Sequence, residues 1–372
     1  SGIRRFFDIA NEMDNVISLS IGEPDFTTPW HVRQEGIKSL EDGKTWYSPN
    51  RGFIELREEI CKWLKRHYHI EYESKTDVVV TVGGSEAIDL CIRCLVNPGD
   101  EVLIPEPCFV CYKPLTQIAE GVPVTIQTKQ EDNFRLTAKA LREKITPKSK
   151  LLILPFPNNP TGAVMRRKDL EEIAEVVKEN NLIVLSDEIY SELTYGETRH
   201  VSISSIEGMK ERTVVINGFS KAFAMTGWRL GYAVGPKEII KQMTKLHQYG
   251  IMSAPTVSQY AAIEAMKNGD SDINYMREQY DMRRRLIVNG FNKMGLTCFE
   301  PEGAFYVFPC IKSTGMTSEE FCEKLIYSER VAVVPGSAFG DCGEGYLRVS
   351  YSYSIKHITE ALSRIEHFIK SL

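Results

Sequence analysis

Short apolar strand patterns alternate with helical patterns through most of this chain, and this alternation constrains its fold more than any other feature. The strand patterns lie at residues 77–82, 101–104, 151–154, 182–185 and 213–216. A helical pattern at residues 86–95 follows the first of them. Alternation of this kind predicts an α/β fold with a mixed, mostly parallel sheet and helices on both faces.

Small or polar residues follow several of these strands at their carboxyl ends. They are Gly84, Asn159, Asp187 and Lys221. In an open α/β sheet, ligands bind in the crevice outside the carboxyl ends of the strands. The repetition therefore predicts that these residues share one site.

The sequence pattern changes after about residue 265. A long polar helical stretch at residues 272–294 precedes strand patterns at 304–308, 331–334 and 346–350. We expect a large domain over residues 36–265 and a smaller α+β domain over residues 266–372. An N-terminal arm, residues 1–35, would join the small domain. The run Arg283-Arg284-Arg285 is expected to form a solvated helix face.

Composition restricts the class of protein. The chain has 372 residues, 42% of them hydrophobic and 26% charged, with a formal net charge of −5. These values are typical of a globular protein with more than one core, and the acidic balance gives no reason to expect nucleic acid or an anionic membrane as partner. No apolar run reaches the roughly 18 residues of a membrane helix. Residues 1–5 lack the apolar core of a signal peptide, so we expect a cytoplasmic protein.

Two C-x-x-C pairs raise the question of zinc. Cys91 and Cys94 are separated from Cys108 and Cys111 by 13 residues, which is close to the spacing of a zinc ribbon. The first pair, however, lies inside an apolar helical pattern and resembles core residues. The odd total of nine cysteines also argues against a full disulfide framework. We expect no metal site, and a zinc assay on the purified protein tests this.

One lysine stands in an unusual environment. Lys221 lies in a run of small, aromatic and hydroxyl residues, 217–231, and Arg229 follows it in the same run. A poorly solvated lysine has a lowered pKa and a nucleophilic amine, which can form a Schiff base with an aldehyde cofactor. An arginine side chain can hold a phosphate as a fork of donors.

This segment resembles the lysine segment of fold-type I aminotransferases of class I/II, which depend on pyridoxal 5'-phosphate (PLP). Further motifs of the family follow in the expected order, from Gly22 in residues 20–26 through Asn159 in Asn-Pro-Thr-Gly and Asp187 in Ser-Asp-Glu-Ile-Tyr to Arg348 in a late strand. The sequence of segments such as residues 191–195 and 247–249 resembles the branch of aspartate, aromatic and N-acetyl-diaminopimelate aminotransferases. The resemblance implies the PLP-transferase fold and PLP as the cofactor.

The resemblance assigns roles around the ring of PLP. Lys221 would bind the aldehyde, Asp187 would face the ring nitrogen, and Tyr190 and Asn159 would donate to the phenolic oxygen. Lys221, Asp187 and Tyr190 would be the catalytic residues. Phe109 would lie against the ring. Considered locally, Asp187 fits a turn or a helix cap equally well, and Phe109 fits a core position.

Four residues are implied as contacts of the phosphate: Gly84, Ser85, Ser220 and Arg229. The glycine turn between strand and helix offers backbone N–H groups at a helix N-terminus, which favours an anion. Some branches of the family carry a hydroxyl residue where this chain has Gly218. One phosphate contact is therefore missing or is supplied elsewhere, for example by water.

The resemblance also assigns the substrate and the assembly. Arg348 is a lone arginine in an apolar strand pattern, and a buried arginine needs an anionic partner. It would hold the α-carboxylate of the substrate, with Gly22 and Asn159 nearby. Tyr47 resembles a tyrosine that reaches the PLP phosphate of the neighbouring subunit, which implies a homodimer with shared sites.

The implied activity is transfer of an amino group from an L-amino acid, aromatic or acidic, to a 2-oxo acid such as 2-oxoglutarate by a ping-pong mechanism. Lys221 would act as general base and then as general acid. A PLP-dependent β-carbon–sulfur lyase shares the same residues, so it stays open as the alternative. A PLP-fold regulatory module would need a DNA-binding domain, for which we see no room before Gly22. The cysteine pairs leave a metal-binding protein as the remaining alternative.

Overall fold

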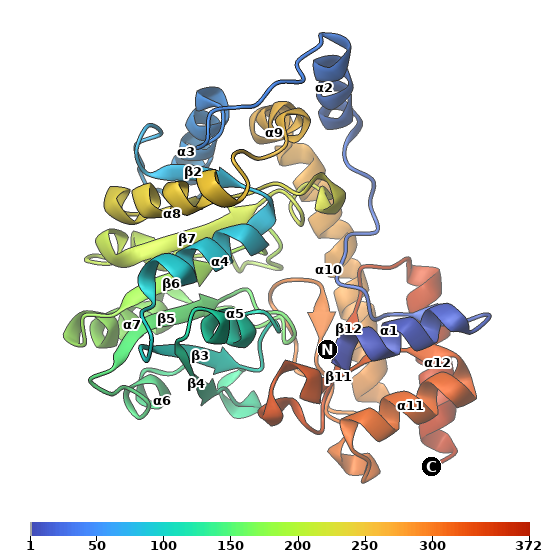
Figure 1. Ribbon diagram of the computed structural model, residues 1–372. Coiled ribbons are helices and arrows are strands. Elements are labelled where there is room, and N and C mark those ends of the chain that lie inside the picture. Colours follow the sequence, from blue (N-terminus) through green and yellow to red (C-terminus); the bar gives the residue numbers. More distant parts are fainter. Residues whose placement is uncertain (1) are drawn as a thin grey trace.

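The computed structural model describes residues 2–372, with the side chains of residues 2–5 and 7 left out. Its largest element is a seven-stranded sheet (Figure 1). Only β8 (Gly231–Val234) runs antiparallel to its neighbours in this sheet. This confirms the predicted mixed, mostly parallel sheet. In spatial order the strands are β2 (Val78–Thr81), β8 (Gly231–Val234), β7 (Thr213–Gly218), β6 (Ile183–Asp187), β5 (Ser149–Pro155), β3 (Glu101–Glu106) and β4 (Val122–Gln127).

Helices cover both faces of this sheet, because successive strand residues point to opposite sides. Val79 joins the hydrophobic cluster on one face, whereas Val78 and Val80 join the cluster on the other. The first face is covered by α4 (Gly83–Leu95), α5 (Tyr112–Ile118) and α8 (Lys237–Gly250). The second is covered by α3 (Ile54–Tyr68), α6 (Ala138–Arg142), α7 (Arg167–Glu179) and α9 (Thr256–Asn268).

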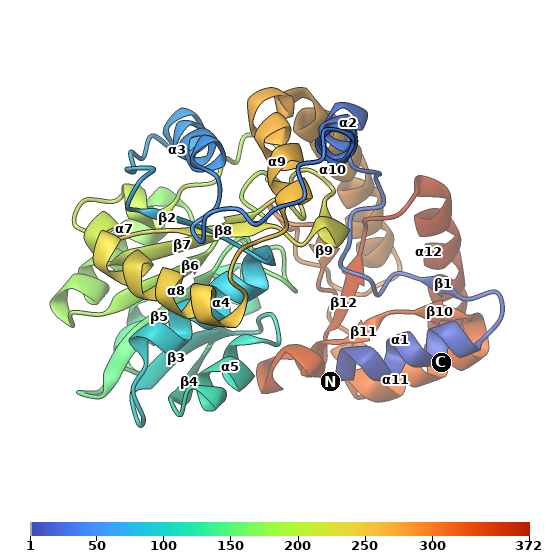
Figure 2. The same ribbon diagram turned by 45° about the horizontal axis from the view of Figure 1, so that its top comes forward.

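The C-terminal part forms a second body together with the N-terminus (Figures 1 and 2). It contains an antiparallel sheet of three strands and a parallel pair that joins the two ends of the chain. The sheet consists of β11 (Val334–Pro335), β12 (Leu347–Ser350) and β9 (Tyr306–Val307), and the pair of β1 (Ile17–Ser18) and β10 (Val331–Ala332). The helices around them are α1 (Gly2–Glu12), α10 (Asp270–Lys293), α11 (Ser318–Glu329) and α12 (Ile355–Lys370).

The boundaries predicted between the domains, after residues 35 and 265, stay a prediction. The first would fall inside α2 (Trp30–Glu41) and the second inside α9, and these two helices pack against each other. The hydrophobic clusters divide within α10 instead, where Ile273 joins the cluster of the large domain and Met276 that of the small domain. We propose that the small domain begins within α10.

The arginine run on α10 differs from its prediction. Only Arg285 is exposed, whereas Arg283 and Arg284 are buried. Arg283 Nη1 lies 2.8 Å from Asp25 Oδ1 in the N-terminal loop, and Arg284 donates to Glu300 and to the backbone oxygen of Pro301. The expected solvated face is therefore wrong for two of the three residues. A long-range acid such as Asp25 has no signature in the local sequence of the helix.

The cysteines contribute to packing. All nine are free thiols, and Cys91, on α4, and Cys108 belong to the same hydrophobic cluster. Among the described residues, no three His, Cys, Asp or Glu side chains are grouped so that they could hold a metal ion. No helix in the described part of the chain has the length and apolarity needed to cross a membrane.

Candidate active site

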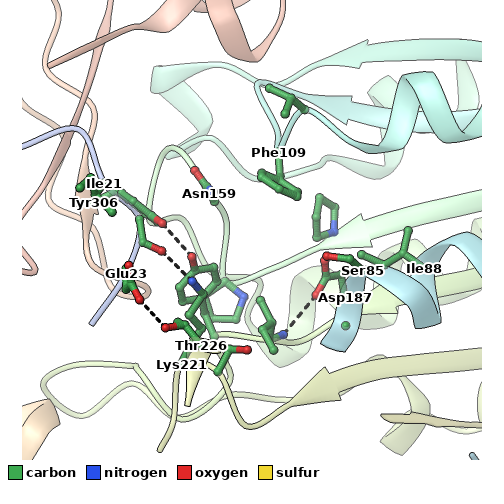
Figure 3. Close-up of a pocket in the computed structure, with 18 of the residues that line it drawn as sticks. Ile21, Glu23, Ser85, Ile88, Phe109, Asn159, Asp187, Lys221, Thr226 and Tyr306 are labelled. Atoms are coloured by element: carbon green, nitrogen blue, oxygen red, sulfur yellow. Dashed lines mark hydrogen bonds between the residues drawn. The ribbon is translucent and has the colours of Figure 1, made fainter. Parts of the chain in front are cut away.

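A cavity of about 800 Å³ lies at the carboxyl ends of the parallel strands, where the small domain faces the sheet (Figure 3). Of the twelve site residues predicted from the sequence, all but one line it. The exception is Tyr47, which is 79% exposed on the surface. The eleven predicted residues that line the cavity are Gly22, Gly84, Ser85, Phe109, Asn159, Asp187, Tyr190, Ser220, Lys221, Arg229 and Arg348.

Lys221 lies on the loop between β7 and β8, whose ends pair through Gly218 and Gly231. Its Nζ donates a hydrogen bond of 2.6 Å to the backbone oxygen of Gly22. Burial lowers the pKa of Lys221 to about 8, although the charge of Glu23 opposes the shift. Because the pKa is lowered, a larger fraction of the amine is unprotonated and nucleophilic near neutral pH than for an exposed lysine.

Asp187 ends β6 and is buried. Tyr112 donates its hydroxyl proton to Oδ2 over 2.7 Å, and the backbone N–H of Ile189 donates to Oδ1 over 3.2 Å. Burial raises the pKa of Asp187 above its ordinary value, and these hydrogen bonds limit the shift. A cationic ring nitrogen opposite the carboxylate would lower the pKa again and keep the group charged.

Tyr112 was missed by the sequence reasoning. It begins α5, three residues after Phe109, and its side chain is fully buried. Its position beside Phe109 was the only available signal, because the hydrogen bond to Asp187 joins residues 75 apart in the chain. Phe109 is half-buried and lines the cavity (Figure 3). Its ring meets the Tyr112 ring edge to face, with 6.3 Å between centroids.

Arg348, on β12, is a buried cation. Its Nη1 donates to Asn159 Oδ1 over 3.1 Å and its Nη2 to the backbone oxygen of Ser20 over 2.5 Å, while its Nε is buried without a hydrogen-bond partner. Burial lowers the pKa of Arg348, and the side chains that oppose this shift are tyrosines. A buried guanidinium with an unused donor fits an external carboxylate.

A second tyrosine completes this side of the cavity. The hydroxyls of Tyr190 and Tyr306 are 2.8 Å apart, and the Arg348 guanidinium carbon lies 4.7 Å from the centroid of the Tyr306 ring. Tyr306 was expected only as part of a strand. Its role in the wall depends on the small domain packing over the sheet, which no local pattern reveals.

The glycine turn and Arg229 form the other end of the cavity. Helix α4 begins at Gly83, three residues earlier than expected, so Gly84 and Ser85 lie in its first turn. Gly83 has a φ of +72°, and a Cβ there would lie 2.6 Å from Arg229 Nη2. The guanidinium therefore lies directly against the helix N-terminus. Backbone N–H groups together with an arginine are suited to an anion such as phosphate.

The absence of a hydroxyl residue at position 218 has a steric reason. A Cβ on Gly218 would lie 3.0 Å from the Cα of Gly231 and 3.1 Å from the backbone oxygen of Leu230. Strand β8 passes too close at this point for a side chain to fit without a shift of the backbone.

The chain was compared with known proteins. The family model described as aminotransferase class I and II matches residues 14–365. An aspartate aminotransferase of Pyrococcus abyssi is 46% identical over 372 residues, which cover 100% of this chain and 96% of that protein. The aromatic-amino-acid aminotransferase 2 of Thermococcus litoralis is 45% identical over the same coverage. The solved structure of an aromatic aminotransferase from Pyrococcus horikoshii has a TM-score of 0.95 at 46% identity and covers 98% of this chain and 99% of that chain.

These findings also bear on the alternatives. The relatives are aminotransferases, and the lyase alternative finds no support among them. The match to the family extends through both domains and includes all the residues around the cavity except those before residue 14. The chain therefore belongs to the class I and II aminotransferases and is a transaminase enzyme.

Proposed function

We propose that this aminotransferase binds PLP through Lys221 and transfers the amino group of an aromatic or acidic L-amino acid to a 2-oxo acid. The observation that carries the proposal is the position of Lys221. Its amine, with a pKa lowered to about 8, lies in one cavity with a buried carboxylate, Asp187, and an anion site at Arg229. An aldehyde, a ring nitrogen and a phosphate are the three groups of PLP that these residues fit.

The remaining walls fit the ring. Phe109 offers an aromatic face, and Tyr190 and Asn159 bring a hydroxyl and an amide to the same cavity. The hydroxyl of Tyr190 is held by Tyr306, and the carboxylate of Asp187 is held by Tyr112. Polar groups that are fixed in this way need no reorganisation when they meet charge.

When bound, PLP supplies an aldehyde that condenses with amines and an electron-poor ring that takes up the electron pair left at the substrate Cα. The chain supplies the proton transfer: once the amine of the substrate has taken its place on the aldehyde, the freed Lys221 Nζ would remove the Cα proton and later return a proton. Asp187 holds the proton on the ring nitrogen. Arg348 fixes the substrate carboxylate and so orients the Cα–H bond toward Lys221.

The cavity favours an aromatic over a dicarboxylic donor. Its lining cations are Lys221, Arg229 and Arg348, and all three already have a partner in the proposal. The wall beyond them includes the apolar side chains of Ile21 and Ile88. Among the side chains that the structure describes, this subunit therefore offers no further cation in the cavity for a second carboxylate.

A panel of amino donors with 2-oxoglutarate tests the function. We expect glutamate to form with PLP-loaded protein, and kcat/KM to be higher for tyrosine or phenylalanine than for aspartate. A higher kcat/KM for aspartate would contradict the preference alone. Formation of pyruvate and ammonia from cysteine or cystathionine, without glutamate from any donor, would contradict the aminotransferase activity.

Arg348→Lys tests the carboxylate site. Lysine keeps the charge but loses the planar fork, so we expect kcat/KM for the amino acid to fall about 10²-fold, mainly through a higher KM. The affinity for PLP should not change. The exposed Arg285 offers a matched control, because Arg285→Lys lies outside the cavity and should leave kcat/KM as it is. Equal kinetics for Arg348→Lys and the unsubstituted protein would assign the carboxylate to another residue.

We propose that a second copy of the chain covers the surface around Tyr47. Large apolar side chains are exposed on these segments: Trp30, Ile37 and Leu40 of α2, Trp46 and Tyr47, Tyr249 near the end of α8, and Ile251 and Met252 after it are each at least 44% exposed. The segments are tied together, because Asn50 donates to the backbone oxygen of Met252 and Thr256 to that of Trp46. An exposed apolar surface of this size is typical of an interface. A monomer in sedimentation velocity would contradict the dimer and with it the role of Tyr47.

A further inference from the structure

We propose that His247 and Glu86 form a buried positioning pair that holds the phosphate-binding turn of α4 in place. The inference rests on the proposed function, since the phosphate is that of PLP. Neither residue touches the cavity, and neither was singled out as a site residue from the sequence.

The pair joins two neighbouring helices. His247 lies on α8 with its side chain fully buried, and its Nδ1 is 2.6 Å from Glu86 Oε1 on the first turn of α4. The side chain of Glu86 is 12% exposed. The two helices pack side by side over the same face of the sheet, which Figure 1 shows.

Glu86 in turn closes the phosphate-binding turn. Its second oxygen, Oε2, accepts a hydrogen bond of 2.5 Å from the backbone N–H of Val82. Val82 comes before the turn and Glu86 follows it, so one carboxylate ties both ends of the segment that contains Gly84 and Ser85. A tie of this kind fixes the direction in which the backbone N–H groups of the turn point.

Among the described residues, the side chain of His247 forms a hydrogen bond with Glu86 alone. Its Nε2 is buried without a hydrogen-bond partner, so the carboxylate of Glu86 is the one polar group that its side chain contacts among the described residues. A buried polar side chain with a single partner is expected to have a specific role in orienting that partner.

The pair also has an electrostatic effect. The carboxylate of Glu86 comes directly after Ser85, so without a partner its charge would repel the phosphate from the anion site. A hydrogen bond from the imidazole draws negative charge to Oε1, toward α8. Removal of His247 should therefore weaken the hold on the phosphate, whereas Lys221 and Asp187 remain as they are.

A comparison of PLP with pyridoxal, which lacks the phosphate, tests the inference. For His247→Leu in cofactor-free protein, we expect the Kd for PLP to rise about tenfold and the Kd for pyridoxal to change less than twofold. His247→Asn, whose amide nitrogen can take the place of Nδ1, should restore most of the affinity for PLP. Both constants are measured by the absorbance change on binding, so no turnover is involved.

A core variant of the same helix controls for lost stability. Ile240 is fully buried on α8, and Ile240→Ala should lower the melting temperature and leave the ratio of the two Kd values unchanged. If His247→Leu does not fold, Glu86→Gln carries the test of the tie, because it removes the charge of the carboxylate and weakens the hydrogen bonds to His247 and to the backbone N–H of Val82 while it keeps the shape of the side chain. In the double variant that combines His247→Leu with Glu86→Gln, the Kd for PLP should equal that of Glu86→Gln alone, since the two residues act as one unit.

Two results overturn the inference. One is an unchanged Kd for PLP in the folded variants, and the other is an equal loss of PLP and pyridoxal, which would indicate a general structural role. If the unsubstituted protein binds neither compound, the proposed function fails along with the inference. Normal binding of both by the unsubstituted protein and by the variants overturns the inference alone.

Discussion

Lys221→Ala should lower kcat for transamination by about 10⁴-fold or more, because the substitution removes both the amine that captures the aldehyde and the base that moves the Cα proton. The variant should also lack the visible absorbance of PLP bound covalently to the protein. Steady-state glutamate formation with the best donor and the spectrum of the loaded protein give the two measurements.

Two further variants separate the chemistry of Lys221 from its charge. Lys221→Arg keeps a cation in the cavity but has no amine that condenses with an aldehyde, so it should be as inactive as the alanine variant. Lys75 is exposed and remote from the cavity, and Lys75→Ala should have normal kcat. Retention of substantial turnover by Lys221→Ala would refute the assignment.

Asp187→Asn should lower kcat by about 10³-fold, because a neutral amide cannot keep a proton on the ring nitrogen and the ring then accepts electrons poorly. The substitution preserves the shape of the side chain. Its amide oxygen can still accept from Tyr112 or Ile189, so we expect the variant to fold. The measurements are kcat in the steady state and, with PLP-loaded protein in a single turnover, the rate constant for loss of the Cα proton of the donor.

A milder variant gives the matched comparison. Tyr112→Phe removes one hydrogen bond from Asp187 and keeps its charge, so its kcat should lie between those of the unsubstituted protein and of Asp187→Asn. A kcat for Asp187→Asn within tenfold of normal would indicate that the carboxylate does not control the ring.

Much of the fold and of the site could be predicted, because the relevant patterns are local. Continuous apolar runs such as residues 77–82 identify strands with two buried faces, and the carboxyl-end rule then places Asn159, Asp187 and Lys221 at one edge of the sheet. The resemblance to the family added Arg348, whose strand belongs to a different sheet. That side chain reaches the same cavity only because the small domain packs over the sheet.

The residues that were missed depend on contacts between distant parts of the chain. Tyr112 and Asp187 are 75 residues apart, and Glu86 and His247 are 161 apart. Each pair joins two elements that sequence patterns can identify, but no pattern tells which side chains meet between them. Arg283 was misread for the same reason, since its partner, Asp25, lies in the N-terminal loop.

The pairing of Gly218 with Gly231 has a consequence for the thermodynamics of cofactor binding. The loop that carries Lys221 and Arg229 leaves one strand of the sheet and returns directly to its neighbour. The conformational entropy of closing this loop is therefore lost when the protein folds, and little remains to be lost when PLP arrives. Cofactor-free protein should already hold the amine and the guanidinium at their working separation. Association should then be limited by access to the cavity and not by ordering of the loop.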